Sequence, residues 1–338
     1  MLEGVLPEGF TPVLIAVLVL AVAFDYINGF HDTANAIATS VSTRALKPSW
    51  AIAMSAVANF TGALIGTEVA KTVGSGLIDT NVESQTVIAA ALVGAITWNL
   101  ITWRLGIPSS SSHALIGGLL GAALVSAGIG SWQMDGVVGK VLLPLVASPL
   151  IGFVVGLLLM VVIFNVFRRA HPGRLNATFR RLQVVSAAFM AFSHGSNDAQ
   201  KTMGIMTLAL VTAGIQTTFD PPLWVILTAA TALSLGTAAG GWRIIHTMGT
   251  KVVKLDPVHG FAAETTAATI IIGASHFGMP VSTTHVISSA IMGVGSSDRL
   301  RTVRWSVARS IVTAWILTIP ASGLTAAVAY LVLDPFLG

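Results

Sequence analysis

The sequence contains no cysteine among its 338 residues, and only 9% of its residues are charged. The absence of cysteine excludes disulfide bonds, metal sites built on thiolates and cysteine nucleophiles. The scarcity of charge accompanies 54% hydrophobic residues and a mean hydropathy of +0.82. Long runs of this composition are too apolar for a soluble core, so the chain is predicted to be an integral membrane protein.

Further absences narrow the class of protein. No Gly-x-x-x-x-Gly-Lys-Ser/Thr loop occurs in the chain, which disfavours a pump driven by nucleotide hydrolysis. The acidic stretch at residues 1–8 lacks the basic region of a secretory signal, so no cleavage is expected. The sequence pI of 9.8 does not indicate a nucleic-acid partner, because the basic residues cluster between apolar segments, where they indicate membrane topology.

What is present is a series of apolar segments in two sets, separated by the most basic stretch of the chain, 168–181. The first set comprises 11–43, 48–70, 86–103, 109–129 and 139–167, and the second comprises 182–213, 222–243, 259–277, 281–296 and 304–333. The positive-inside rule places the basic stretch in the cytoplasm. We therefore predict an all-α, multi-pass protein of the plasma membrane with both termini extracellular. It has about 10 hydrophobic segments, or 10–12 depending on how broken helices are counted.

Each set holds an odd number of segments, so the second set must enter the membrane from the opposite side. Such inverted-topology repeats are common in secondary transporters. The prediction is a first repeat over 1–167, a cytoplasmic loop over 168–181 and a second, inverted repeat over 182–338. Motifs that recur in the same order support a duplication, such as Gly66-Thr67-Glu68-Val69-Ala70-Lys71 and Gly249-Thr250-Lys251-Val252-Val253-Lys254.

The most informative repeated motif places an aspartate inside an apolar segment of each half. Gly29-x-x-Asp32 aligns with Gly195-x-x-Asp198. An ionised aspartate at the centre of a membrane helix costs about 2.5–3.5 kcal/mol, so a matched pair indicates an ion or substrate path more than a contact between helices. These segments are about 32 residues long and exceed the hydrocarbon core as straight helices. We expect them to tilt strongly, to break or to carry an unwound stretch, with Gly29 and Gly195 as the natural break points.

A second repeated motif joins a proline to hydroxyl residues and a histidine. Proline favours the first helical turn and Ser or Thr caps it, so each motif predicts a helix N-terminus. Free N–H groups, hydroxyls and the positive end of the helix dipole suit an oxyanion, and two such termini can converge on one tetrahedral anion. The candidate anion ligands are Ser110, Ser111, Ser112, Ser282, Thr283 and Thr284. The sequence leaves open whether Pro108 and Pro280 lie at the tips of re-entrant hairpins or between full spans.

Two aspartates repel an oxyanion unless a proton, a sodium ion or a divalent metal intervenes. Asp32 and Asp198 are therefore predicted to hold the coupling cation, and they are metal ligands only if that cation is sodium or divalent. A proton is favoured, because His31 beside Asp32 titrates near neutral pH, although no such group flanks Asp198. Glu264 is either part of the cation path or a helix-end residue near the interface. Amides that can bridge cation and anion are Asn35, Asn197 and Gln200.

In these motifs the chain resembles the inorganic phosphate transporter (Pit) family. The resemblance rests on Gly-x-(Asn/His)-Asp-x-(Ala/Gln) and Pro-x-Ser-(Ser/Thr)-(Ser/Thr)-His, each in both halves, and it covers essentially the whole chain. It implies a cation-coupled phosphate symporter with an inverted repeat and extracellular termini. His31 stands where many members have asparagine, and this variant is similar to the bacterial low-affinity branch, which is associated with proton coupling and metal–phosphate complexes. Some relatives carry sulfate.

The prediction is therefore a non-enzymatic symporter that imports inorganic phosphate, free or as a metal complex, without a resident cofactor. The alternatives are a sulfate permease of the same family and a passive anion channel, which needs no cation gradient. A hydrolase is disfavoured, because adjacent Ser–His or Thr–His residues on a helix point about 100° apart. The lipid bilayer is the expected surrounding, and a homodimer is possible. The Gly152-x-x-x-Gly156 pair packs helices within the subunit or between subunits, and we expect the former.

Overall fold

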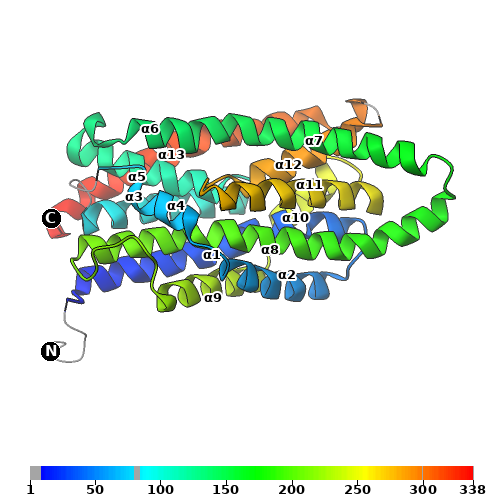
Figure 1. Cartoon of the computed structure of the whole chain (residues 1–338). Helices are drawn as coiled ribbons and strands as arrows, with labels where there is room; N and C mark the ends of the chain where they lie inside the picture. The colour runs from blue at the N-terminus through cyan, green and yellow to red at the C-terminus, as the bar shows by residue number, and fades with distance from the viewer. Residues whose placement is uncertain (1–8, 80–83, 299, 338) are drawn as a thin grey trace.

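The structure is a computed structural model that describes residues 9–79, 84–298 and 300–337 as a bundle of helices (Figure 1). The first half contains α1 (Pro12–Ser42), α2 (Pro48–Ala63), α3 (Glu68–Ser75), α4 (Gln85–Leu105), α5 (Ser111–Ala127), η1 (Ile129–Ser131), α6 (Met134–Gly136), η2 (Val137–Leu142) and α7 (Leu143–Phe167). The second half contains α8 (Pro172–Thr212), α9 (Leu223–Ala239), α10 (Trp242–His246), η3 (Thr247–Lys251), α11 (Pro257–His276), α12 (Thr283–Ser296), η4 (Leu300–Thr302) and α13 (Trp305–Leu337).

Four helical stretches are long and apolar enough to cross a membrane, namely α1, α4, the continuous stretch from α6 to α7, and α13. The number rises to six if α2 with α3, bent by 72°, and α9 with the helix ending at Lys251, bent by 61°, each form one span. Among the described residues, α5 and α12 are shorter than a membrane span, and α8 and α11 are long enough but more polar. The protein is therefore an all-helical membrane protein, and about ten crossing segments stays a prediction.

The two helices that carry the aspartates are continuous, so the prediction that they break at Gly29 and Gly195 is wrong. Both glycines instead allow close helix contacts. A Cβ atom on Gly29 would lie 2.2 Å from the Leu233 carbonyl oxygen of α9, and one on Gly195 would lie 2.1 Å from that of Asn59 on α2. Small residues permit this approach of helix backbones. The bends occur in the partners, between α2 and α3 and after α9.

The basic stretch that precedes the second half is a loop only over residues 168–171. Helix α8 begins at Pro172, whose fixed φ suits the first helical position, so residues 172–181 form its first turns. In Figure 1 this part of α8 projects at the end of the molecule opposite to the start of α1.

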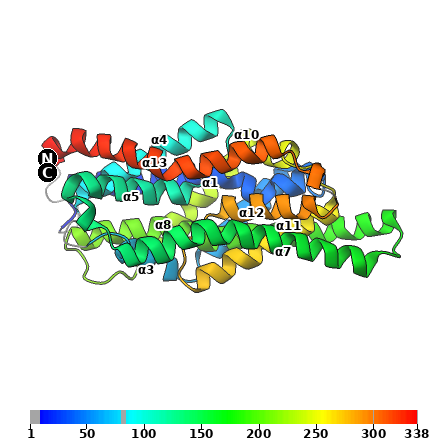
Figure 2. The ribbon, with the colours of Figure 1, turned by 90° about the horizontal axis from the view of Figure 1, so that it is seen from above.

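The two halves interleave in a reciprocal way. Helix α1 packs against α9, and α8 packs against α2; α13 covers α4 and α5, and α7 covers α11 and α12 (Figures 1 and 2). A Cβ atom on Gly152 of α7 would lie 2.4 Å from Ser289 Oγ of α12, and one on Gly156 would lie 2.9 Å from the Ala290 carbonyl oxygen. This confirms that the glycine pair packs helices within the subunit. The interleaving encloses the polar motifs at the centre of the bundle.

Candidate anion and cation site

Both hydroxyl motifs begin a helix, as their composition predicts. Ser110 Oγ accepts the N–H of His113 at 3.1 Å at the start of α5, and Ser282 Oγ accepts the N–H of His285 at 3.2 Å at the start of α12. From these starts α5 and α12 run toward opposite ends of the molecule (Figure 1), and the rings of His113 and His285 are 4.7 Å apart. The N-termini of the two helices therefore face each other inside the bundle.

The first turn of α12 contacts both aspartate motifs. Asn35 Nδ2 donates to the Thr284 hydroxyl at 2.9 Å and to the Thr283 hydroxyl at 3.3 Å. Thr283 donates to Asp198 Oδ2 at 3.1 Å, and Thr284 donates to Asp32 Oδ2 at 3.5 Å. All five side chains are buried. The structure thus brings together residues that the sequence analysis assigned separately to the anion and to the cation.

Each aspartate lies beside a histidine. His31 Nδ1 is 2.6 Å from Asp32 Oδ1, and its Nε2 is 3.0 Å from the Thr102 hydroxyl. His194 Nε2 is 3.0 Å from Asp198 Oδ2. The expectation that no imidazole accompanies Asp198 is therefore wrong. His194 lies one helical turn before Asp198 on α8, a spacing that places two side chains on the same helix face.

A buried lysine at the centre of the site was not anticipated from the sequence. Lys201 Nζ contacts the Asp198 carboxylate and donates to Ser112 Oγ at 2.5 Å and to the Val281 carbonyl oxygen at 3.1 Å. Its side chain is 2% exposed. The signal was available, because Lys201 follows Asp198 by the same three residues that separate Asn35 from Asp32.

Three predicted ligands present buried polar atoms that have no hydrogen-bond partner among the described residues. They are Asn35 Oδ1, Ser111 Oγ and Asn197 Oδ1. The amide nitrogen of Asn197 is used, since it donates to Ser275 Oγ at 2.8 Å. Buried polar atoms are nearly always paired in native proteins, so atoms without a protein partner are candidates to contact a bound ion.

The structure does not bring Gln200 to the hydroxyl motifs. Its Oε1 accepts the N–H of Val69 in the first turn of α3 at 2.9 Å, and its Nε2 donates to the Ser196 carbonyl oxygen at 2.6 Å. The Oε1 end of this amide therefore stabilises the bend between α2 and α3, and the Nε2 end bonds within α8.

Glu264 also lies apart from the two aspartates. Its carboxylate accepts hydrogen bonds from Thr39, from Ser186 at 2.5 Å and from Gln183 at 3.2 Å, between α1, α8 and α11. Thr39 is two turns beyond Asp32 on α1, which corresponds to roughly 10 Å along the helix. Glu264 is fully buried and lies two turns inside α11, so it is not at a helix end.

Asp32, His194 and Asp198 each offer a ligand atom, and these atoms lie within 4.8 Å of one another. Two carboxylates and an imidazole can hold a transition metal, whereas sodium and magnesium prefer sites made of oxygen alone. The Asp198 carboxylate already contacts the Lys201 ammonium. These ligand atoms can therefore hold a proton or a transition metal ion. They are least suited to an ion that prefers oxygen ligands alone, such as sodium or magnesium.

Two cavities lie at the two helix bends. One, of about 170 Å³, lies at the α2–α3 bend and reaches Ser196 and Gln200. The other, of about 380 Å³, lies where α4 ends beside α10 and is lined by Arg104, Arg243 and Lys251. Because the bends occupy corresponding places in the two halves, the cavities form a matched pair.

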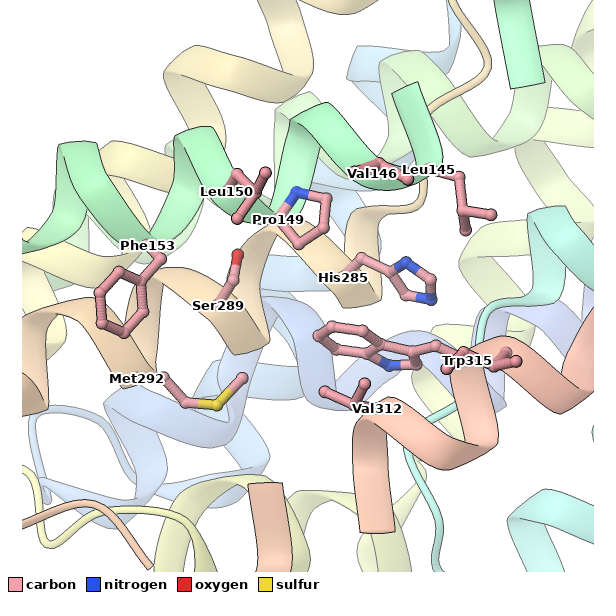
Figure 3. A pocket seen from close by; sticks show the side chains of 11 residues that line it. Leu145, Val146, Pro149, Leu150, Phe153, His285, Ser289, Met292, Val312 and Trp315 are labelled. Carbon is pink, nitrogen blue, oxygen red and sulfur yellow. The ribbon is translucent and has the colours of Figure 1, made fainter. Parts of the chain in front are cut away.

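A third cavity, of about 390 Å³, lies behind α12 between α7 and α13 (Figure 3). His285 and Trp315 form part of its wall, with ring centroids 4.0 Å apart in a stacked arrangement. The other labelled side chains around it are mostly apolar, including Leu150 and Phe153. This cavity is therefore separate from the polar site and does not suit an inorganic anion.

Comparison with known proteins relates residues 28–326 to a family described as "Phosphate transporter family". The chain is 50% identical over 323 residues to a protein of Bacillus subtilis (strain 168) named probable low-affinity inorganic phosphate transporter, covering 95% of this chain and 97% of that protein. A protein of Rhizobium meliloti (strain 1021) with the same name is 49% identical over 325 residues, covering 96% of this chain and 97% of its own. A solved structure titled "The sodium-dependent phosphate transporter" matches with a TM-score of 0.89 and 25% identity, covering 97% of this chain and 100% of that chain.

Proposed function

Because the chain belongs to the phosphate transporter family, we propose that it is a cation-coupled symporter that imports inorganic phosphate across the plasma membrane. Its relatives are named as transporters, which is a non-enzymatic function. The observation that carries the proposal is the contact of one helix N-terminus with both buried aspartates, through Thr283 to Asp198 and through Thr284 to Asp32. An anion held at that N-terminus is bound next to the carboxylates that take up the cation.

The phosphate is proposed to bind between the facing first turns of α5 and α12. Their free N–H groups, their positive dipole ends and the hydroxyls of Ser111, Ser112, Thr283 and Thr284 are all suited to an oxyanion. Asn35 and Asn197 complete the set, while Ser110 and Ser282 act mainly as caps. A protonated phosphate oxygen can donate to a carboxylate or to Asn35 Oδ1, which fully deprotonated sulfate cannot do. This difference favours phosphate over sulfate.

The coupling cation is proposed to be a proton held by the aspartate–histidine pairs. The support is that His31 lies 2.6 Å from Asp32 and His194 lies 3.0 Å from Asp198, so each carboxylate has an imidazole within hydrogen-bonding distance that can share a proton with it. Sodium is the alternative, because the structural relative is named as sodium-dependent. Glu264 is proposed as a further carboxyl in the cation path, beyond the pair on α1.

Transport is proposed to use two inverted repeats that rock about the shared site. The reciprocal packing of α1 on α9 and of α8 on α2 supports this arrangement. The cavity at the α2–α3 bend reaches Ser196 and Gln200 of α8, and it is proposed as one approach to the site, with the cavity beside α10 as the other. The facing starts of α5 and α12 favour re-entrant hairpins at Pro108 and Pro280. Both chain termini are proposed to be extracellular and residues 168–181 cytoplasmic, on the basis of the positive-inside rule.

The test is uptake of labelled phosphate and of labelled sulfate into proteoliposomes under separate proton and sodium gradients. We expect phosphate to accumulate against its gradient when only a proton gradient is imposed. Accumulation driven by a sodium gradient alone would identify sodium, not the proton, as the coupling cation. Dependence on added magnesium would indicate that a metal–phosphate complex is transported. Phosphate that only equilibrates, whatever the cation gradient, would make the protein a channel, and a preference for sulfate would make it a sulfate permease.

A further inference from the structure

Lys201 occupies the position in the second half that Asn35 occupies in the first. Both residues follow the motif aspartate by three positions on a long helix. Both also donate to the hydroxyl motif of the opposite half: Asn35 to Thr284 of α12 at 2.9 Å, and Lys201 to Ser112 of α5 at 2.5 Å. The duplicated site therefore contains a neutral amide on one side and an ammonium group on the other.

Lys201 has the contacts that a buried ammonium group requires. A buried ammonium is tolerated only when it is paired and its donors are used. Lys201 Nζ has three partners, the Asp198 carboxylate, Ser112 Oγ and the Val281 carbonyl oxygen, and three is the number of donors that an ammonium has. Asp32 contacts no lysine or arginine among the described residues, and its ionisable partner is His31.

The net charge of the site follows from this asymmetry. With neutral imidazoles, the ammonium of Lys201 cancels the carboxylate of Asp198, and the carboxylate of Asp32 stays uncompensated. A site with asparagine in both halves would carry both carboxylates uncompensated and would need one more cation before it could accept an anion.

Resting on the proposed function, we propose that Lys201 is a fixed cation that takes the place of one transported cation. Of the two aspartate–histidine pairs proposed above to hold the cation, the pair at Asp198 is thereby neutralised by the protein itself, and only the pair at Asp32 takes up an exchangeable cation with each phosphate. Lys201 thereby sets how many cations accompany the anion, whether that cation is a proton or sodium.

Asp25 is the other acidic group that the lysine could neutralise. It is fully buried on α1, and its carboxylate interacts electrostatically with both Lys201 and Asp198. It makes no ion pair with Lys201, whereas Asp198 does. Asp25 therefore provides a matched control, since it is an acid of the same type near the same ammonium.

The experiment compares steady-state phosphate accumulation in proteoliposomes at zero membrane potential, over a series of gradients of whichever cation drives wild-type uptake. One cation per phosphate allows a tenfold cation gradient to sustain about tenfold accumulation, and two cations allow about hundredfold. Lys201→Asn gives the second half the same residue that the first half has at the corresponding position, Asn35. We expect it to show the steeper dependence, or to lose uptake because Asp198 is left uncompensated. Normal uptake with the wild-type dependence would overturn the proposal.

The decisive variant removes both charges of the pair. Asp198→Asn combined with Lys201→Asn keeps the net charge of the site, so we expect it to regain uptake with the wild-type dependence on the cation gradient. Asp25→Asn combined with Lys201→Asn should not regain it. Failure of the Asp198 pair in a protein that elutes and unfolds like wild type, or equal recovery by the Asp25 pair, would overturn the assignment.

A further variant adds a positive charge to the site instead of removing one. Asn35→Lys places an ammonium in the first half as well, so the variant should equilibrate phosphate without responding to the cation gradient. Retained concentrative uptake would contradict the proposal. Wild-type uptake is measured first, because its absence contradicts the proposed function itself, whereas differences among the variants bear only on Lys201.

Discussion

Ser111 in the first turn of α5 and Thr283 in the first turn of α12 are both proposed to bind phosphate, although they differ in what they already contact. Ser111 Oγ has no partner within the described chain, whereas Thr283 donates to Asp198 at 3.1 Å. Replacing either residue by Ala removes one donor to a charged acceptor, about 1.5–3 kcal/mol, or roughly ten- to a hundredfold in apparent phosphate affinity. Uptake at varied phosphate concentration measures the effect.

Ser289→Ala is the matched control for these substitutions. Ser289 lies on the same helix as Thr283 but lines the apolar cavity behind it, and its hydroxyl donates to the Val286 carbonyl oxygen. Its replacement should leave phosphate affinity unchanged. Unchanged affinity in both Ser111→Ala and Thr283→Ala, at normal membrane abundance, would reduce the two hydroxyl motifs to helix caps.

Asp32→Asn and Asp198→Asn should each abolish cation-driven uptake, for different reasons. Asparagine at position 32 mimics a protonated carboxyl that cannot release its proton, so exchange of phosphate across the membrane should persist while net uptake is lost. Asparagine at position 198 leaves the buried Lys201 ammonium without its counter-charge. Counterflow of labelled phosphate separates the two cases. Concentrative uptake by Asp32→Asn would show that Asp32 does not carry the cation.

At the scale of the helix, the contact between α8 and α2 depends on the missing side chain of Gly195. An added Cβ atom would lie 2.1 Å from the Asn59 carbonyl oxygen, so Gly195→Ala forces the two backbones apart. Overpacking of this kind typically destabilises by about 1–3 kcal/mol. We expect a lower midpoint of thermal unfolding for the purified protein in detergent.

Gly273→Ala is the control for that prediction, with the opposite sign. A Cβ atom on Gly273 of α11 would meet nothing within 4 Å, and alanine is favoured over glycine in a helix by roughly 0.5–1 kcal/mol. This variant should unfold at the same or a slightly higher temperature. Equal unfolding midpoints for the Gly195 and Gly273 variants would show that α8 and α2 can move apart without loss of stability.

For the whole molecule, the absence of cysteine provides a direct test of topology. Arg174 lies in the first turn of α8 and Asp334 near the end of α13, and both side chains are exposed. In intact cells, an impermeant maleimide should label a single cysteine at position 334 and not one at position 174. The reverse pattern would invert the proposed orientation. The acidic N-terminal residues 1–8, also predicted to be extracellular, lie outside the described residues.

Local sequence chemistry determined the helices and the choice of candidate residues. The proline–hydroxyl motifs predicted helix N-termini, and α5 and α12 begin there because proline and a serine cap satisfy the requirements of a first turn within a few residues. Matched Asp32 and Asp198 marked the polar centre, because buried charge in an apolar segment is informative without any knowledge of its neighbours.

Contacts between distant residues were decided only by the tertiary structure. Gly29 and Gly195 read equally well as break points or as close contacts, and only the position of α9 and α2 distinguishes the two. Gln200 looked like a member of the site, but its polar atoms bond elsewhere. Lys201 was an ordinary cation in the sequence and became part of the site because α8 places it within reach of Ser112, 89 residues away along the chain. Pairing between residues so far apart depends on how the helices pack, which no local pattern encodes.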